Sequence, residues 1–339
     1  MIISENLNTK ILMSNEVYIY RNLKDIAFPS KLSVEEGREI SEKISTAILK
    51  NKTYKFKKVN LWEESKKNLF LLLELGIISF KLYKNREYSS VLINRDERCV
   101  VMINEENHIT LLYRGIKTSC RELYNRAQKI MDDISREFEI GYNDRFGYLS
   151  STIDKLGTGI KAYTILHLPL LNNIKEIEGL ITELDKVGIE FSDVFTNEEE
   201  GISNLYKLSN KITVGVTAEE IFNDIEAMTH QVIIKETKER KYLKETDYEG
   251  LCDDIFRAKG ILENARKMTY KEEIKLISKL RLGIELGLIK NISIADINEL
   301  FLTTKYNHIK SLTDEKIIEN QENILRATKI RERLNEFIV

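Results

Sequence analysis

The sequence predicts an α+β fold in which helices flank an antiparallel sheet and an all-helical domain follows at the C-terminal end. Only two of the 339 residues are proline, and apolar residues recur with a helical period over long stretches. Strand-like segments alternate irregularly with these helices through hairpin-like turns, which favours an antiparallel sheet over a doubly wound parallel one. From about Thr269 onward only helical patterns remain.

The first half of the chain is expected to hold a helix, two neighbouring strands and a second helix. Ser33 and Glu36 have the spacing of a capping box, and isoleucines after them share one helix face. The β-rich runs 99–103 and 109–113 flank a polar connection, which predicts adjacent strands. A stripe of apolar residues predicts a helix over 119–138.

The segment after the turn 157–159 is expected to be a short helix. A second helix follows it and carries the apolar residues Ile174, Ile177, Ile181 and Leu184. Strands are predicted near 189–195 and 204–214. A long helix is predicted to begin at Thr217, with Glu220 at the capping-box position.

The last part of the chain is predicted to form a separate helical domain. Thr269 and Glu272 have capping-box spacing, and apolar residues follow through 274–289. The final helix is expected over 315–337. A chain of this length suggests about two domains, and we place a larger domain over 1–255 and a helical domain over 265–339.

Composition and charge argue against several functional classes. The formal net charge is −2, so no overall basic field indicates a nucleic-acid partner. Cys99, Cys120 and Cys252 lie far apart without CxxC spacing, which indicates a reduced, cytoplasmic chain without a disulfide framework or metal site. The longest apolar stretch, 69–80, is broken by a glutamate and is too short to span a bilayer. It is interpreted as core, and neither a signal peptide nor a membrane partner is expected.

Segment 146–169 carries the most specific motif, FGYLSSTIDKLGTGIKAYTILHLP. It resembles the active-site segment of bacterial protein-arginine kinases, relatives of arginine and creatine kinase, whose pattern GYLTxCPTNxGTGxRAS runs into HLP. Thr152 stands at the cysteine position of that pattern, and Lys161 at the position of a phosphate-binding arginine. Lysine keeps the charge but lacks the planar fork that binds two phosphate oxygens together.

Segment 104–110 reads NEENHIT and resembles the family's NEEDHIR. In the family the second glutamate is the catalytic base and the arginine binds nucleotide. Glu106 therefore retains the base position, while Asn107 replaces the aspartate and Thr110 the arginine. A carboxylate suits this role because it can orient a guanidinium through a two-pronged ion pair and accept its proton.

Segment 21–29 reads RNLKDIAFP and resembles the family's RNLxDIPFP, which follows a segment with two phosphate-binding arginines. Counting back along the chain, those two positions fall on Glu16 and Tyr18. A carboxylate at about 4 Å from a phosphate oxygen repels it by several kcal/mol in a partly desolvated site. Glu16 therefore opposes triphosphate binding.

Segment 188–200 resembles GLxVRGxYGEGSE, with Ser192 at a further arginine position, Asn197 at a glutamate position and an acidic run at its end. Segment 204–215 resembles NxFQISNQITLG, with lysines in place of two glutamines.

The resemblance continues into the helical tail, where 280–289 is similar to LRLGVDLGLI. Near the end Glu322, Asn323 and Arg326 occupy the place of the family's RDxxR phosphoarginine sensor, and only Arg326 is retained. The resemblance thus covers nearly the whole chain.

This resemblance implies a phosphagen-kinase-like phosphotransferase domain and a helical domain for dimerisation and sensing. Five nucleotide-binding arginine positions hold other residues: Glu16, Tyr18, Thr110, Lys161 and Ser192. Phosphoryl transfer depends on positioned positive charge, so a pseudokinase without a nucleotide cofactor is expected. The family context implies a regulatory or adaptor role in protein quality control, as a homodimer with Clp-type protease or chaperone partners or an activator protein.

Two enzyme hypotheses remain open. The first is an active protein-arginine kinase that uses Mg-ATP, with Glu106 as base and with substitute cations at Lys155, Lys161, Lys207 or Lys211. The second is a kinase for free guanidino compounds. It faces the same difficulty, because it would also need the arginines that this chain replaces. Binding of Mg-ATP separates the first of these from the pseudokinase.

Overall fold

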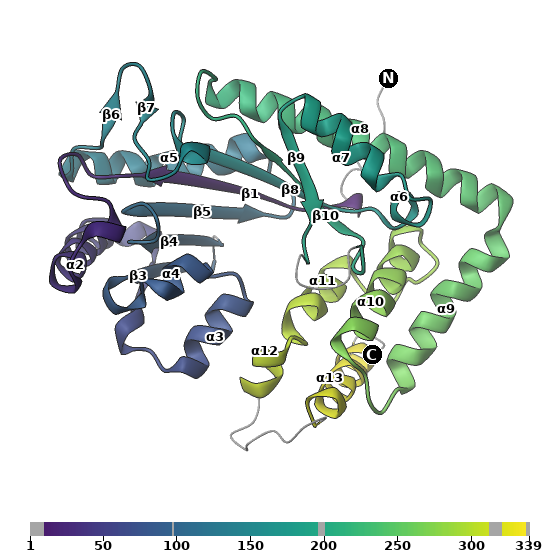
Figure 1. Cartoon of the computed structure of the whole chain (residues 1–339). Coiled ribbons are helices and arrows are strands. Elements are labelled where there is room, and N and C mark those ends of the chain that lie inside the picture. The colour runs from purple at the N-terminus through teal and green to yellow at the C-terminus, as the bar shows by residue number, and fades with distance from the viewer. Residues whose placement is uncertain (1–9, 97, 196–200, 312–320, 337–339) are drawn as a thin grey trace.

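The computed structural model describes residues 10–96, 98–195, 201–311 and 321–336. At its centre lies an eight-stranded antiparallel sheet of order β2-β3-β4-β5-β1-β8-β10-β9 (Figure 1). Its strands are β1 (Leu12–Arg21), β2 (Lys57–Asn60), β3 (Ser90–Asn94), β4 (Cys99–Ile103), β5 (Ile109–Gly115), β8 (Ile160–His167), β9 (Ile189–Asp193) and β10 (Leu205–Asn210). A small hairpin of β6 (Tyr142–Asn143) and β7 (Gly147–Tyr148) stands apart from it. The predicted α+β class is confirmed.

One face of the sheet is covered by α2 (Val34–Lys50), α5 (Cys120–Glu137), α7 (Ile177–Lys186) and α8 (Ala218–Thr246), as Figure 1 shows. Alternate strand residues such as Val17, Leu111 and Ala162 point to this side and form the largest core with the helices. The capping boxes predicted at Ser33 and Thr217 are both present. Short 3₁₀ turns complete this domain: η1 (Pro29–Lys31), η2 (Lys52–Tyr54), η3 (Leu61–Glu63), η4 (Arg86–Tyr88) and η5 (Ile153–Lys155).

Two separate groups of helices lie on the opposite side of the sheet. Helices α3 (Lys66–Glu74) and α4 (Phe80–Lys84) pack with β3, β4 and β5 around Leu112. The C-terminal helices lie toward the β8 and β10 end, where Leu205 joins their core. Between the two groups the side chains of Glu16, Tyr18 and Tyr163 are only partly buried.

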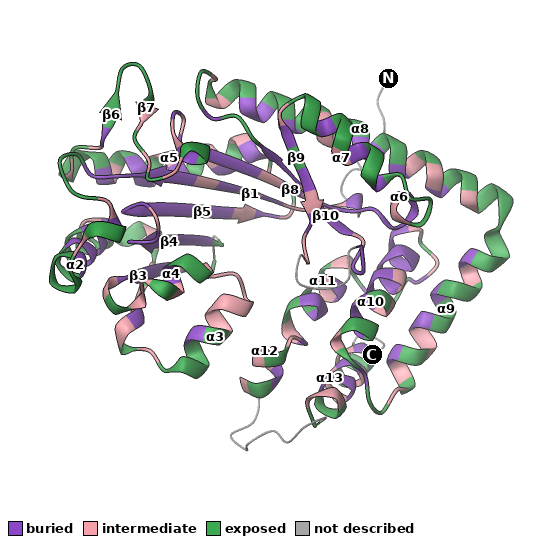
Figure 2. Ribbon diagram, in the orientation of Figure 1, coloured by how far each residue is buried: buried purple, intermediate pink, exposed green. Residues whose placement is uncertain are grey.

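The C-terminal region is helical, as predicted, and contains α9 (Tyr248–Asn264), α10 (Tyr270–Glu285), α11 (Ile294–Thr303), α12 (Tyr306–Ser311) and α13 (Gln321–Glu336). The apolar residues of 274–289 are mostly buried within this region (Figure 2). Helix α12 also contacts α3, because the Glu74 carboxylate accepts backbone N–H bonds from Asn307 and His308 at 2.8 and 2.7 Å.

A buried polar network joins the sheet domain to α10. The Glu285 carboxylate lies 2.7 Å from the Arg240 guanidinium and also contacts Arg281. Burial, followed by the charges of Arg281 and Arg240, holds the pKa of His167 well below its usual range. His167 is therefore neutral, with Nδ1 3.1 Å from Glu285 and Nε2 2.8 Å from the Ser278 hydroxyl. Every charged group in this network has a partner, so the network links the sheet region to α10 through buried contacts.

Two details differ from the sequence-based predictions. Segment 160–167 is the strand β8 rather than a short helix, because it pairs with β1 on one side and β10 on the other. Helix α6 (Pro169–Asn173) comes after it and begins at the proline. At Thr269 only the half of the capping box in which the hydroxyl accepts from Glu272 is present. The start of the predicted final helix, Asn197 and the acidic run 198–200 lie outside the described residues.

Within the described part of the chain, no helix combines the length and apolar character needed to cross a membrane. The same residues contain no group of three or more His, Cys, Asp or Glu side chains arranged to hold a metal ion. All three cysteines are free thiols, with Cys99 and Cys120 buried and Cys252 partly exposed.

Candidate functional site

The five arginine positions of the family pattern converge on one face of the sheet. Thr110 lies on β5, Glu16 and Tyr18 on β1, Lys161 on β8 and Ser192 on β9. Tyr18 pairs directly with Lys161 across the β1–β8 ladder. Because residues two apart on a strand point to the same side, the register places all five on the face that carries α3 and α4.

The Glu16 carboxylate forms an ion pair with Arg114, its cross-strand neighbour on β5. Arg114 Nε lies 2.8 Å from Glu16 Oε1, and its Nη2 donates to the Gly76 carbonyl at 2.8 Å. The Tyr18 hydroxyl also donates to Glu16, at 3.3 Å. Glu16 is thus held as a carboxylate on the sheet face, and its charge is balanced by a protein side chain.

Three tyrosines fill the area next to this ion pair. The rings of Tyr18 and Tyr20 stack with centroids 6.1 Å apart, and Tyr163 meets Tyr18 edge-on at 5.4 Å. Burial, with added repulsion from nearby acidic groups, raises the pKa of all three hydroxyls. These side chains are therefore neutral and bulky, and they carry no charge that attracts an anion.

Lys161 is buried, and its ammonium group donates to the Asn210 carbonyl at 2.6 Å. Burial lowers its pKa, although the charges of Glu190 and Asp154 oppose this shift. Of the other predicted substitute cations, Lys211 pairs with Asp185 away from the sheet face, and Lys207 lies across the ladder from Ser192.

Glu106 lies in the connection between β4 and β5, and two lysines hold it. Lys81 of α4 contacts one carboxylate oxygen and Lys155 of η5 the other. Burial alone would raise the pKa of Glu106, but the hydrogen bonds and charges of Lys155 and Lys81 lower it below its usual range. The carboxylate is ionised, and both of its oxygens have cationic partners.

Glu105 and Thr110 form a second pair beside Glu106. The Thr110 hydroxyl donates to Glu105 at 2.9 Å, and Ser79 at the start of α4 contacts the other oxygen of Glu105. The residue at the family's arginine position therefore serves to hold a neighbouring carboxylate. Both Glu105 and Glu106 are also connected to α4.

Asn107 organises the backbone around segment 150–152. Its side-chain oxygen accepts hydrogen bonds from Asn22 at 2.6 Å and from the Ser150 hydroxyl at 2.9 Å. Thr152, two residues after Ser150, donates its backbone N–H to the Ser150 hydroxyl at 3.3 Å. The structure thus connects Asn107, the chain neighbour of Glu106, to the segment that contains Thr152.

The turn 157–159 has a packing role that explains its glycines. Both glycines have positive φ, at 89° for Gly157 and 59° for Gly159. A Cβ on Gly157 would lie 2.2 Å from the Thr213 carbonyl, and one on Gly159 would lie 2.5 Å from the buried Arg21 guanidinium. The glycines are therefore required for close approach of backbone and side chain.

The sensor-like residues lie apart from this sheet site, on α13. The Arg326 guanidinium is buried and donates to the carbonyls of Thr304 and Met268 at 2.9 and 3.1 Å and to Asn323 at 2.6 Å. Glu273 lies 3.4 Å away, and burial raises its pKa to about 8. These hydrogen bonds occupy the Arg326 guanidinium with contacts inside the helical region. Glu322 is partly exposed.

Sequence reasoning missed Arg114 and Lys81. Arg114 follows the recognised segment 104–110 at even spacing from Thr110, so strand alternation could have placed it on the same face. Nothing in the sequence signalled that Lys81, 25 residues before Glu106, would contact it.

Comparison with known proteins identifies the family. Residues 39–239 match the ATP:guanido phosphotransferase C-terminal catalytic domain, and residues 248–338 match the protein-arginine kinase McsB C-terminal domain. The chain is 31% identical to the protein-arginine kinase of Clostridium tetani over 98% of its length and 97% of that protein. It is 30% identical to the protein-arginine kinase of Geobacillus stearothermophilus over 97% and 92% of the two chains.

Solved structures with the same fold include two guanidino kinases. The substrate-free duplicated taurocyamine kinase of Schistosoma mansoni aligns with a TM-score of 0.60 at 22% identity, over 79% of this chain and 40% of that one. This chain therefore spans less than half of that duplicated protein. Lombricine kinase aligns with a TM-score of 0.58 at 18% identity, over 68% and 67% of the two chains. The sequence matches place this chain in the protein-arginine kinase family of ATP:guanido phosphotransferases.

Proposed function

We propose that this protein-arginine kinase homologue is a pseudokinase, and that it acts by binding other proteins. The observation that carries the proposal is the Glu16–Arg114 ion pair on the sheet face, at a position where the family pattern has arginine. Phosphoryl transfer needs positive charge placed against phosphate oxygens, and this pair has no net charge.

The residues on this face do not fit a magnesium-bound triphosphate. Tyr18, Tyr20 and Tyr163 are neutral and occupy the area beside Glu16. Lys161 is committed to a backbone carbonyl. A triphosphate would meet a carboxylate and aromatic rings where it needs several cations, so we assign no nucleotide cofactor to the chain.

The state of Glu106 also supports the proposal. A base for an attacking guanidinium needs free carboxylate oxygens to orient the group and accept its proton. Lys81 and Lys155 already hold both oxygens and lower the pKa of Glu106, which makes it a weaker proton acceptor.

One observation favours the alternative, an active protein-arginine kinase that uses Mg-ATP. Glu106 is retained and ionised, and Lys155 supplies a cation beside it that could move toward a phosphate. Under this alternative, nucleotide binding would have to displace the Lys155 contact.

A Mg-ATP titration tests the proposal. A ligand raises the melting temperature only by binding the folded state preferentially, so millimolar Mg-ATP should leave the melting temperature of this chain unchanged. Mass spectrometry should find no phosphoarginine on a basic protein incubated with the chain and ATP. The Clostridium tetani protein-arginine kinase, assayed alongside, serves as the reference. A saturable shift with micromolar affinity would favour the active kinase.

Family resemblance supplies the biological context. We propose a regulatory or adaptor role in cytoplasmic protein quality control, with a Clp-type protease or chaperone, or an activator protein, as partner. A helical region beside a sheet face that lacks the cations for phosphoryl transfer is consistent with a protein that binds partners but does not transfer phosphate.

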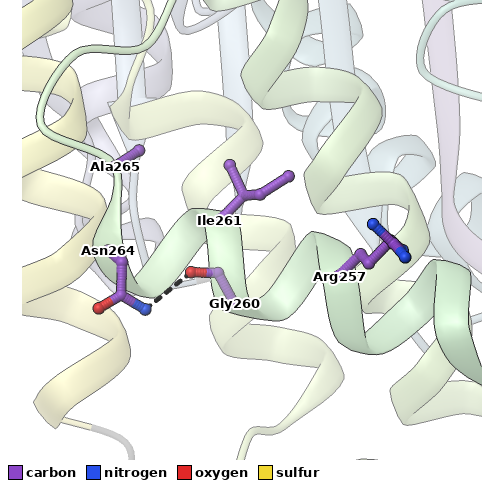
Figure 3. Close-up of a pocket in the computed structure, with 5 residues that line it drawn as sticks. All are labelled: Arg257, Gly260, Ile261, Asn264 and Ala265. Atoms are coloured by element: carbon purple, nitrogen blue, oxygen red, sulfur yellow. Dashed lines mark hydrogen bonds between the residues drawn. The ribbon is translucent and has the colours of Figure 1, made fainter.

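We further propose that the chain forms a homodimer through its helical region. The apolar residues of 274–289 serve the internal core, so the contact surface has to lie elsewhere. Helix α9 offers a pocket of ≈ 490 Å³ lined by Arg257, Gly260, Ile261, Asn264 and Ala265 (Figure 3). Phe256 beside it is half exposed.

A further inference from the structure

Helices α3 and α4 and the turn η4 present a group of exposed and partly exposed aromatic and basic side chains, which we call the α3–α4 patch: Phe70, Phe80, Tyr83, Lys84 and Arg86. The Tyr83 ring lies between the two phenylalanines, with centroids 5.6 Å from Phe70 and 6.1 Å from Phe80. Phe80 is 61% exposed and Phe70 41%. These are large apolar surfaces to leave in contact with water.

The two phenylalanines of the patch lie outside the core beneath it. Leu69 of α3 and Leu82 of α4 are buried and fill the space against β3, β4 and β5. Tyr83 is partly buried and packs against this core, whereas Phe80 and Lys84, four residues apart, are exposed on α4. Phe70 and Phe80 therefore extend outward from this core, and the described chain leaves much of their surface uncovered.

Cations border the rings. Lys84 Nζ lies 4.9 Å from the centre of the Phe80 ring, and the Arg86 guanidinium lies 5.0 Å from that of Tyr83. Arg86 also has a weak contact with the adjacent Glu87 at 3.4 Å. Among the described residues no carboxylate forms an ion pair with Lys84. The patch thus combines aromatic surface with available positive charge.

We infer that the α3–α4 patch is a docking surface for an acidic protein segment that carries an aromatic or aliphatic anchor residue. The anchor would pack against Phe80 and Tyr83, and carboxylates on either side of it would meet Lys84 and Arg86. Aromatic and arginine side chains are enriched among residues that dominate binding energy, which suits this composition. The inference rests on the proposed adaptor function and names the chemistry of its partner.

The position of the patch connects it to the sheet site. Ser79 and Lys81 flank Phe80 in sequence and contact Glu105 and Glu106. A segment docked on Phe80 would therefore lie next to the residues that hold both carboxylates.

The experiment measures fluorescence anisotropy of three labelled peptides on the full chain without nucleotide. The first has Asp and Glu on both sides of a central Trp-Leu pair, the second replaces the acids with Lys, and the third replaces the apolar pair with Ser. Only the first should bind saturably. Phe80→Ser should weaken its binding about tenfold or more. Lys84→Gln should weaken it severalfold and reduce its salt dependence.

Tyr242→Ser is the matched control, because Tyr242 on α8 is also 61% exposed but lies outside the patch. It should bind the first peptide as the wild type does. Absence of saturable binding by the first peptide, equal binding of the lysine peptide, or unchanged binding by Phe80→Ser would overturn the inference. If the chain binds both Mg-ATP and the acidic peptide, the docking surface is supported and the pseudokinase proposal is contradicted. A chain that binds neither Mg-ATP nor the acidic peptide keeps the pseudokinase proposal and loses the docking inference.

Discussion

Glu16 Oε1 lies 2.8 Å from Arg114 Nε, and this contact joins two neighbouring strands on the face of the sheet that the family pattern assigns to nucleotide. The pair is partly buried, with side-chain exposures of 15% and 27%. Its net charge is zero, and Arg114 is additionally bound to the Gly76 carbonyl. Arg114 therefore neutralises Glu16 and is not free to bind an anion.

Restoring arginine at all five family positions should recover measurable ATP binding but little catalysis. A triphosphate clamp acts as a unit, so its members are strongly non-additive. The variant replaces residues on one sheet face: Glu16, Tyr18, Thr110, Lys161 and Ser192. Catalysis should stay poor because Asn107 and Thr152 still differ from the family pattern. Calorimetry measures the binding.

The single variant Lys161→Arg is the control for that experiment. It leaves Glu16 and the tyrosines in place, so it should bind ATP no better than the wild type. If its affinity equals that of the fivefold variant, the nucleotide site was nearly intact and the active-kinase alternative gains support.

Removing Lys155 should raise the pKa of Glu106. Lys155 donates a hydrogen bond to this carboxylate and adds a favourable charge, both of which lower the pKa in the wild type. Carboxyl ¹³C NMR titration of wild type and Lys155→Ala measures the change. Lys84→Ala removes an exposed lysine from α4 that has no contact with Glu106, and it should leave the titration unchanged. An identical pKa in wild type and Lys155→Ala would contradict the proposed pairing.

His108 should make the protein less stable in acid. Its Nδ1 accepts the backbone N–H of Leu23 at 3.2 Å, its Nε2 lies 3.0 Å from the Ala27 carbonyl, and burial lowers its pKa to about 4. Between about pH 6.5 and 4 the unfolded chain binds a proton that the folded chain excludes, so stability falls as the pH drops through this range. Over this pH range the free energy of unfolding of the wild type should fall by up to about 3 kcal/mol more than that of His108→Gln.

Urea unfolding at several pH values measures this difference. Carboxylates and His167 are common to both proteins, so they cancel in the comparison. His230→Gln, which removes an exposed histidine from α8, should follow the wild type within about 0.5 kcal/mol. Parallel pH profiles for wild type and His108→Gln would show that His108 carries no such effect.

Replacing Glu285 with alanine should destabilise the protein by about 3–5 kcal/mol, because it leaves Arg281 and Arg240 buried without their shared carboxylate. Thermal unfolding measures the loss. The exposed pair Lys241–Glu245 on α8 is the matched control, and Glu245→Ala there should cost less than about 1 kcal/mol. A loss at Glu285 no larger than the loss at Glu245 would mean that the network contributes little.

Phe256→Glu should convert the proposed homodimer to a monomer, because it places a charge on the apolar surface of α9. Sedimentation velocity at tens of micromolar measures the change. This point variant is preferable to truncation from Thr269, since truncation would remove most of the core of the helical region. A wild type that sediments as a monomer would exclude the dimer.

Local patterns in the sequence were sufficient for much of the fold. The capping boxes at Ser33 and Thr217 and the hairpin around 104–108 depend on neighbours in the chain, and all three were predicted correctly. The sequence pattern predicts a helix where the structure has strand β8, which is central in the sheet. A strand paired on both sides gets its conformation from distant partners, here β1 and β10, which local propensity does not encode.

By itself the sequence predicts, through its resemblance to the family, which residues stand at the family positions, and hence that Glu16 and Thr110 take the place of arginines. Only the tertiary structure decided what those residues do. Glu16 is neutralised from 98 positions away by Arg114, and Glu106 is held by lysines 25 and 49 positions away. Such contacts depend on strand register and on how α4 packs on the sheet, because Coulomb and hydrogen-bond energies depend on separation in space and not on separation along the chain.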